Sequence, residues 1–153
     1  MANTFSQIFI HVVFTVKRRE NLISGSWKNE LFMYITGIVR NEKQKLMIIN
    51  GMPDHLHILL SIAPDIRISD LVRDIKSNSS RFINERKFVK GKFNWQEGYG
   101  CFSCSYSNIE KVINYIKNQE EHHKKKSFKE EYIEFLKELK IDYDEKYLFN
   151  WIE

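Results

Sequence analysis

The sequence predicts an α+β protein with a ferredoxin-like fold, in which a four-stranded antiparallel sheet carries two helices on one face. Apolar periodicity predicts the order strand, helix, strand, strand, helix, strand, followed by additional C-terminal helices. RNA-recognition domains share the order of the first six elements. The chain has 153 residues, of which 42% are apolar. We therefore expect a single domain over 1–153, with a core at about 5–123.

A change of period marks the first strand and the first helix. Alternating apolar residues share one face of the strand: Ile8, Ile10, Val12, Phe14 and Val16. Apolar residues then recur at helical spacing: Trp27, Leu31, Tyr34, Ile35 and Ile38. Ser26 precedes this run and is the expected N-cap.

The middle strands are expected to form a hairpin, because the apolar runs at 45–50 and 55–62 are separated by the turn residues 51–54. A second amphipathic helix follows, with Ser69 near its start. Its apolar stripe consists of Ile68, Leu71, Val72, Ile75, Phe82 and Ile83.

The fourth strand is expected at 99–105. Ser107 and Glu110 have the spacing of a capping box and predict the start of a third helix. Ser127 and Glu130 repeat that spacing and predict a last helix at about 127–141.

The formal charge of +4 is unevenly distributed along the chain. Residues 130–153 hold 3 basic and 8 acidic residues, a net charge of −5, which leaves 21 basic and 12 acidic residues, or +9, in 1–129. A basic body indicates a polyanionic partner, nucleic acid first, or else a merely solvated basic surface. Two cysteines exclude a disulfide scaffold and fit a reducing compartment. No apolar run reaches the roughly 18 residues of a membrane helix, so we expect a cytoplasmic protein without a membrane partner.

His55 and His57 are the first candidate functional residues. They are separated by one residue on an expected strand, so both imidazoles point to one sheet face, with Cα atoms roughly 6.5 Å apart. The residues expected on the opposite, helix-covered face are Leu56, Ile58, Leu60 and Ile62. The pair predicts either a metal site on an open sheet face or two ordinary surface histidines, because HxH triplets also arise by chance.

Tyr115 and Gln119 form a second candidate pair. They are four residues apart on the expected third helix and lie about 40° apart around its axis. The apolar stripe that they flank consists of Ile109, Val112, Ile113 and Ile116. This position is equally typical of a boundary tyrosine that packs over its neighbours.

Several motifs together carry a family resemblance. The run Gly51–Leu60, GMPDHLHILL, resembles the metal-binding strand of HUH nucleases, where U is a bulky apolar residue. Tyr115-x-x-x-Gln119 is similar to the nucleophile helix of the single-tyrosine HUH transposases of the insertion sequence 200/605 family. Matches in the right order include a basic cluster at 17–19, the pattern at 68–80 and the WQEGY stretch at 95–99. The resemblance covers roughly 5–123 and departs from the family at Cys101–Cys104.

The resemblance implies a DNA transposase that breaks and rejoins single-stranded DNA. Tyr115 would attack the scissile phosphodiester, remain joined to the 5′ phosphate and free a 3′ hydroxyl. His55, His57 and Gln119 would hold a divalent metal, Mg²⁺ or Mn²⁺, that polarises the phosphate. A metal is needed because a tyrosine with a pKa near 10 is a poor nucleophile at neutral pH. These three ligands are all neutral, which predicts modest metal affinity.

The expected partners are single-stranded DNA hairpins at the element ends and a second copy of the chain in a homodimer. Whether Tyr115 serves its own histidines or those of the second copy is left open by the sequence. Cys101 and Cys104 would face opposite sides of a strand, which argues against a zinc site. The candidate phosphate contacts are Lys17, Arg18, Arg19, Arg73, Lys76, Arg81, Lys124, Lys125 and Lys126.

Two alternative functions follow from the same residues. One is a domesticated, repeat-associated HUH nuclease; a replication initiator or a relaxase belongs to the same class, although relaxases usually carry a third histidine. The other is a non-catalytic, RRM-like nucleic-acid-binding module, which shares the fold but would stack bases on strand aromatics. No such aromatic pattern occurs on the expected third strand.

Overall fold

The fold described here is that of a computed structural model, which describes residues 4–123 and 126–138. The ferredoxin-like core consists of β1 (Ile8–Thr15), α1 (Lys28–Asn41), β2 (Lys45–Met52), β3 (His55–Ile62), α2 (Ile68–Arg86) and β4 (Gly100–Cys104). It is followed by α3 (Ile109–Lys117), α4 (Gln119–His123) and α5 (Phe128–Glu138). Short 3₁₀ turns, η1 (Lys17–Arg19) and η2 (Tyr106–Asn108), follow β1 and β4. The predicted order of the core elements is confirmed, whereas the expected third helix is divided into α3 and α4.

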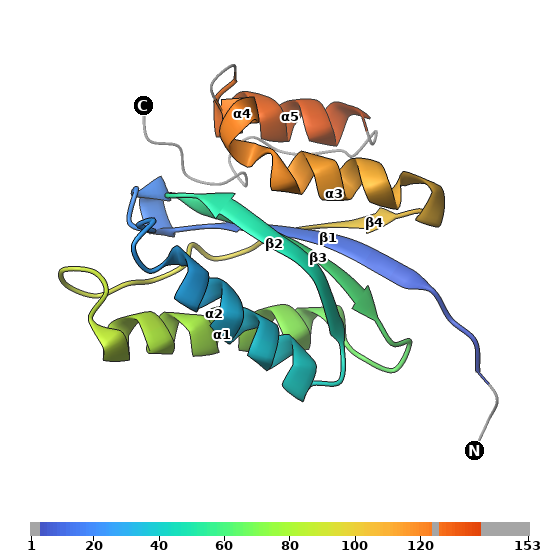
Figure 1. Cartoon of the computed structure of the whole chain (residues 1–153), viewed down its shortest axis with the longest axis horizontal. Helices are drawn as coiled ribbons and strands as arrows, with labels where there is room; N and C mark the ends of the chain where they lie inside the picture. Colours follow the sequence, from blue (N-terminus) through green and yellow to red (C-terminus); the bar gives the residue numbers. More distant parts are fainter. Residues whose placement is uncertain (1–3, 124–125, 139–153) are drawn as a thin grey trace.

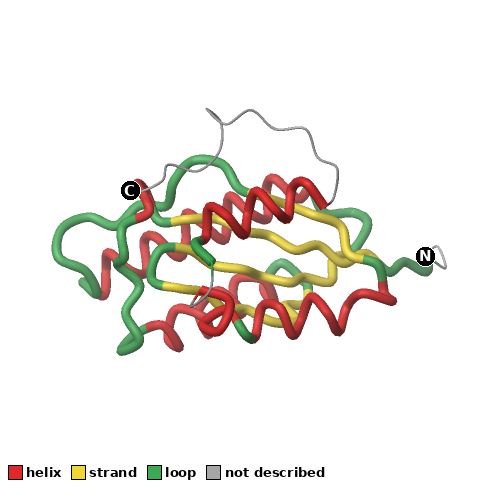
Figure 2. Tube along the Cα trace, turned by 90° about the horizontal axis from the view of Figure 1, so that it is seen from above, coloured by secondary structure: helices red, strands yellow, loops and turns green. Residues whose placement is uncertain are grey.

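The sheet has the order β2-β3-β1-β4, and every neighbouring pair is antiparallel. Figure 2 shows the four strands side by side. β3 and β1 are therefore the central strands, and Thr15 pairs with His55 while Val13 pairs with His57. This register places the histidine pair at the middle of the sheet, near the end of β1.

The main core lies between the sheet and the helices α1 and α2, which cover its lower face in Figure 1. The strands contribute the predicted alternating residues to it: Ile10, Val12, Phe14 and Val16 from the first strand, and Leu56, Ile58, Leu60 and Ile62 from β3. The side chains of α1 and α2 that are buried there include Leu31, Ile35, Leu71 and Ile75. Burial of this apolar surface is the principal stabilising contribution.

The opposite face of the sheet is not open, contrary to the sequence-based expectation. α3, α4 and α5 lie above it in Figure 1, and apolar residues on both sides form two smaller buried clusters. One cluster joins Leu59 to Ile109 and Ile116. The other joins Val13 and Phe102 to Phe128, Tyr132 and Leu136 of α5. The histidine pair is therefore enclosed by helices rather than displayed to solvent.

β2 contains an irregularity that changes which side chains face the helices α3 and α4. The register of β2 against β3 shifts between Leu46 and Ile48, which is a β-bulge. Leu46 and Ile49 consequently point into the main core, whereas Ile48 packs on the α3 side. The shift brings Asn50 opposite His57.

Two of the three predicted helix caps are wrong. Trp27 is the N-cap of α1 and Asn108 that of α3, and neither makes a side-chain cap bond. The carbonyl of Ser24 accepts the Lys28 N–H, so Ser26 is not needed as a cap. Ser107 instead shares a hydrogen bond with the Ser105 hydroxyl. The third prediction is confirmed, because the Ser127 hydroxyl accepts the Glu130 N–H at 3.2 Å.

The β2–β3 turn is tighter than predicted, because Met52 already pairs with His55 and only Pro53 and Asp54 connect the strands. Gly51 is required just before this turn: a Cβ at position 51 would lie 2.3 Å from the His55 carbonyl oxygen. Of the predicted last helix, residues 139–141 lie outside the described residues. No helix in the described part of the chain is both long and apolar enough to cross a membrane.

Candidate active site

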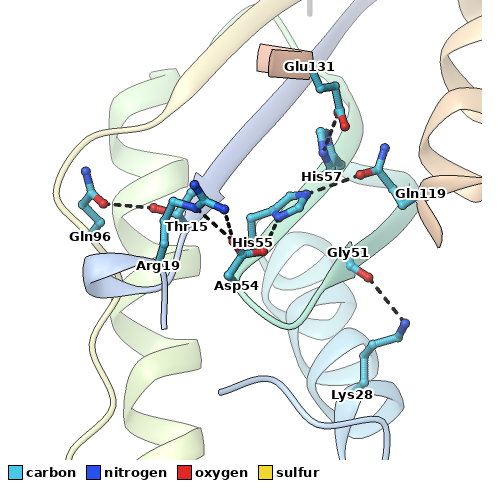
Figure 3. Close-up of polar contacts among 10 residues, drawn as sticks. All are labelled: Thr15, Arg19, Lys28, Gly51, Asp54, His55, His57, Gln96, Gln119 and Glu131. Carbon is cyan, nitrogen blue, oxygen red and sulfur yellow. Dashed lines mark hydrogen bonds and ion pairs between the residues drawn. The ribbon is translucent and has the colours of Figure 1, made fainter. Parts of the chain in front are cut away.

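His55 and His57 lie side by side on β3, as the strand alternation predicts, with ring centroids 5.1 Å apart. Both are buried, with 0% and 2% of their surface exposed. Buried polar groups require partners, and each imidazole has a polar neighbour on both sides. Figure 3 shows Asp54, Gln119 and Glu131 among these neighbours. These neighbours come from β1, the hairpin turn, α4 and α5.

The Nδ1–H of His55 donates to Asp54 Oδ1 at 2.7 Å. Asp54 is in turn held by Arg19, whose Nε donates to Oδ2 at 2.9 Å. Burial alone would raise the pKa of Asp54, but the His55 hydrogen bond and the Arg19 guanidinium hold it below its usual value. Asp54 is therefore an ionised acceptor that fixes the proton of His55 on Nδ1, as carboxylates do behind metal-binding histidines.

The hydrogen bond of Nδ1 to Asp54 leaves Nε2 of His55 directed to the other side of the ring. That atom lies 3.4 Å from Gln119 Oε1, while the Gln119 amide Nε2 donates to the carbonyl of Tyr115 at 3.2 Å. The amide is thereby oriented with its oxygen toward His55. Two electron-pair donors that face each other at this separation suit a cation between them.

His57 is held by a histidine that the sequence analysis did not single out. His57 Nδ1 lies 2.9 Å from Nε2 of His11, which is buried on β1. Burial lowers the pKa of His11 to about 4, so it is neutral at pH 7 and can accept the Nδ1–H of His57. In this tautomer the lone pair of His57 is on Nε2, which lies 3.6 Å from Glu131 Oε1 of α5.

Tyr115 lies over this cluster. Its half-buried ring meets the ring of His57 edge-on at 5.6 Å and that of His11 at 6.2 Å between centroids. Tyr115 and Gln119 do not share one continuous helix, because α3 ends at Lys117 and α4 starts at Gln119, on either side of Asn118. In a single chain, Tyr115 is thus next to its own histidine pair.

Asn50 anchors the end of the tyrosine helix. Its side-chain amide donates to the carbonyls of Ile116 and Lys117 at 2.9 and 3.1 Å. These carbonyls belong to the last turn of α3, where the backbone acceptors lack intrahelical partners. Asn50 therefore sets the distance between the tyrosine helix and the strand that carries His57.

We expect Asn50→Ala to lower the stability by about 1 kcal/mol, because two backbone acceptors lose a donor. It should also slow any reaction of Tyr115 more than it weakens nucleic-acid binding, since only the position of α3 changes. Thermal unfolding and single-turnover kinetics measure the two effects. Asn114→Ala, an exposed position on α3 itself, is the matched control. Equal kinetics for the two variants would contradict the anchoring role.

α5 covers the histidine pair. The ring of Phe128 stacks on that of His55, with centroids 3.9 Å apart and planes 13° from parallel. The Arg19 guanidinium lies 5.6 Å from the same Phe128 ring. Burial, followed by the charges of Asp54 and Glu134, raises the pKa of Glu131 to about 8.

The residues present fit a divalent cation. The Gln119 amide supplies an oxygen ligand that faces the histidine pair, with Oε1 3.4 Å from His55 Nε2. Two imidazole nitrogens and an amide oxygen, with Asp54 and His11 behind the imidazoles, are the donor types expected for Mn²⁺ or Mg²⁺. Cys101 and Cys104 pack on opposite sides of the sheet, as expected, and take no part.

Comparison with known families identifies the chain. The family described as "Transposase IS200 like" matches residues 4–119, which include the histidine pair, Tyr115 and Gln119. The chain belongs to this family. It is therefore a transposase, an enzyme of insertion-sequence transposition, as the motifs predict.

The transposase is similar to two curated relatives. It is 25% identical over 118 residues to the ISDra2 transposase TnpA of Deinococcus radiodurans, covering 74% of this chain and 84% of that protein. It is 25% identical over 130 residues to the transposase for insertion sequence element IS200 of Salmonella typhimurium, covering 81% and 84%.

Two solved structures share the fold. A candidate transposase from Deinococcus radiodurans superimposes with a TM-score of 0.64 at 22% identity, covering 78% of this chain and 95% of that one. The REP-associated tyrosine transposase bound to a REP hairpin gives a TM-score of 0.62 at 13% identity, covering 80% and 73%.

The candidate DNA-contact residues of the transposase do not form one surface. Arg73, Lys76 and Arg81 are on α2, beneath the opposite sheet face. Arg73 is ion-paired with Asp70 and Asp74, and Arg81 donates to Asn78. The Lys76 ammonium donates to the carbonyls of Gln96 and Gly98, and burial lowers its pKa. These cations are tied to the protein and lie away from the histidine pair.

The remaining candidates lie near the site. Lys17 and Arg18 are exposed on η1, directly before the site residue Arg19. Lys126, next to α5, is ion-paired with Glu134. Lys124 and Lys125 lie outside the described residues. The basic cluster at the end of β1 is thus the part of the predicted set that adjoins the candidate active site of the transposase.

Proposed function

We propose that this transposase cleaves and rejoins single-stranded DNA at insertion-sequence ends through a covalent link between Tyr115 and a 5′ phosphate, with a divalent metal at His55, His57 and Gln119. The observation that carries the proposal is the convergence of Nε2 of His55 and Oε1 of Gln119 at 3.4 Å beside the Tyr115 ring. A histidine cluster that served only to stabilise the fold would not need both imidazoles to be oriented by partners, nor a tyrosine beside them.

In the proposed reaction the Tyr115 hydroxyl oxygen attacks the phosphorus, the bond from phosphorus to the 3′ oxygen breaks, and the phenolic proton is lost to solvent or to a site base. The bound cation would polarise the phosphate. Asp54 and His11 keep the imidazole protons on Nδ1, so the lone pair of each Nε2 atom is available to bind the metal. The Gln119 amide holds the Tyr115 backbone, and Asn50 holds the end of its helix. The freed 3′ hydroxyl, or another one, reverses the attack without ATP.

A pocket beside the site supports a nucleic-acid substrate. It has a volume of about 600 Å³ and lies between η1, the hairpin turn and the start of α5. Its lining residues include Arg19, Asp54, Lys126 and Phe128. The exposed cations Lys17 and Arg18 precede Arg19 on η1 at the edge of this pocket and can contact a phosphate backbone. The hairpin-bound structural neighbour supports a DNA hairpin as ligand. We further propose a homodimer, on the resemblance to HUH transposases.

The test uses a labelled single-stranded oligonucleotide that carries the hairpin and flank from the end of the gene's own element. With Mn²⁺ we expect an SDS-resistant protein–DNA adduct, and no adduct when the same sequence is fully duplexed, because a duplex keeps the scissile phosphate from Tyr115. The affinity should fall by about 0.7 log units per phosphate contact for each tenfold increase in salt. Equal cleavage of both forms would exclude the single-strand mechanism, and binding without any adduct would favour a non-catalytic module.

A further inference from the structure

We propose that Glu131 is an additional, anionic ligand of the divalent cation, supplied by the last helix. The inference rests on the proposed metal at His55 and His57 and extends it to a helix outside the region that the family comparison covers, 4–119. It names a residue that neither the motif nor its resemblance identifies.

The placement of Glu131 is the first reason. Its Oε1 lies 3.6 Å from His57 Nε2, whereas His11 contacts the other ring nitrogen, Nδ1. Figure 3 shows the carboxylate directed at this imidazole, with Gln119 on the neighbouring side. The separation is similar to the 3.4 Å between His55 Nε2 and Gln119 Oε1, the pair that suits a cation between its atoms.

The composition of the site is the second reason. Mg²⁺ and Mn²⁺ favour oxygen ligands and are usually bound through at least one carboxylate, whereas the two imidazoles and the amide carry no charge. Within the described residues, Asp54 and Glu131 are the carboxylates within 4 Å of a site imidazole. Asp54 is committed to Nδ1 of His55 and to Arg19, on the side away from the Nε2 atoms. Glu131 is the carboxylate that faces an Nε2 atom.

The way in which α5 is held is the third reason. Phe128 on the same helix is stacked on His55, and Tyr132 and Leu136 are buried against Val13 and Phe102. Gly100 on β4 makes room for this packing, because a Cβ there would lie 2.5 Å from the Tyr132 hydroxyl. The contacts lie before and after Glu131 in the sequence, so the helix holds the carboxylate at the site. The side chain of Glu131 is 11% exposed, whereas that of its neighbour on the same helix, Glu134, is 58% exposed.

The test measures Mn²⁺ binding to the full chain without DNA, by the loss of the free-ion EPR signal, for the wild type, Glu131→Gln and Glu130→Gln. Glu130 is exposed and on the same helix turn, so it is the matched control. Glu131→Gln should weaken Mn²⁺ binding at least about tenfold, since even indirect ligands change affinity by 10–100-fold. Glu130→Gln should bind like the wild type. Co²⁺ absorption spectra should change for Glu131→Gln alone, which reports on the ligand set independently of affinity.

Two controls separate this inference from the proposed function. His57→Asn should remove Mn²⁺ binding, and melting in EDTA should show both His57→Asn and Glu131→Gln to be folded. If His57→Asn removes binding while Glu131→Gln keeps wild-type affinity and spectrum, the role of Glu131 is refuted and the proposed function stands. If the wild type binds no Mn²⁺, the metal part of both proposals is refuted.

Discussion

Tyr115→Phe should abolish the covalent protein–DNA adduct, by at least about 10³-fold, while leaving hairpin binding within a few-fold of the wild type. The substitution removes only the hydroxyl that forms the new bond, and loss of a nucleophile is among the largest single effects in enzymes. The ring contacts with His57 and His11 remain, so the packing of α3 is kept. Denaturing gels with labelled oligonucleotide measure the adduct, and fluorescence anisotropy measures binding.

Tyr106→Phe is the matched control for this experiment. Tyr106 is 71% exposed on η2, and the same hydroxyl is removed there without touching the site. It should form adduct like the wild type. An SDS-resistant adduct of normal yield from Tyr115→Phe would show that another tyrosine is the nucleophile.

His57→Asn should reduce Mn²⁺-dependent cleavage by at least about 100-fold, because it removes an imidazole ligand. Asparagine is preferable to alanine here. The sequence analysis expected the histidine pair on an open sheet face, but His57 is 2% exposed and hydrogen-bonded to His11. Alanine would leave the buried His11 nitrogen without that partner, at a cost of about 1–3 kcal/mol.

Ser61→Ala, on the same strand and face but beyond the site, controls for changes in the sheet. It should cleave at the wild-type rate. Gln119→Ala should have a smaller effect than His57→Asn, because water or a phosphate oxygen can replace one neutral ligand. Cleavage by the wild type that persists in excess EDTA would rule out a metal in the reaction.

The strand pattern was sufficient to predict the fold and half of the site. Alternation along β3 places His55 and His57 on one face and their apolar neighbours on the other, independently of how the other elements pack. It also correctly separated Cys101 from Cys104. These predictions hold because side-chain direction in a strand depends only on local backbone geometry.

The rest of the site depends on the register between strands and on the packing of helices against the sheet, and neither can be predicted from alternation along a single strand. Alternation along β1 predicts which sheet face His11 is on. Its contact with His57 follows only from the register of β1 against β3. Asn50 would face the main core if β2 alternated strictly from Leu46, and only the bulge turns it toward α3. Glu131 reaches the site because α5 packs on the sheet face, which the sequence analysis assumed to be open.

The candidate cations show the limit of charge as a guide to binding. Net charge does not reveal which basic side chains are already paired, and Arg73 and Lys76 are engaged with carboxylates and carbonyls of the protein. Arg19 was predicted to contact phosphate, yet it holds Asp54 and so acts on His55. Spatial pairing, rather than composition, decides the role of each cation.

The two halves of the proposed metal site differ in stiffness. The imidazoles stand on β3, which is hydrogen-bonded on both sides, so their separation is dictated by the strand repeat and cannot adjust to the radius of an ion. The opposing oxygen of Gln119 belongs to the five-residue helix α4, which is too short to be stable by itself. The proposed site would therefore discriminate between divalent ions through the position of Gln119 on α4, which can adjust more readily than the imidazoles on β3. Substitutions that loosen α4 should change the ratio of Mn²⁺ to Mg²⁺ affinity, whereas substitutions in the β3 core should weaken both alike.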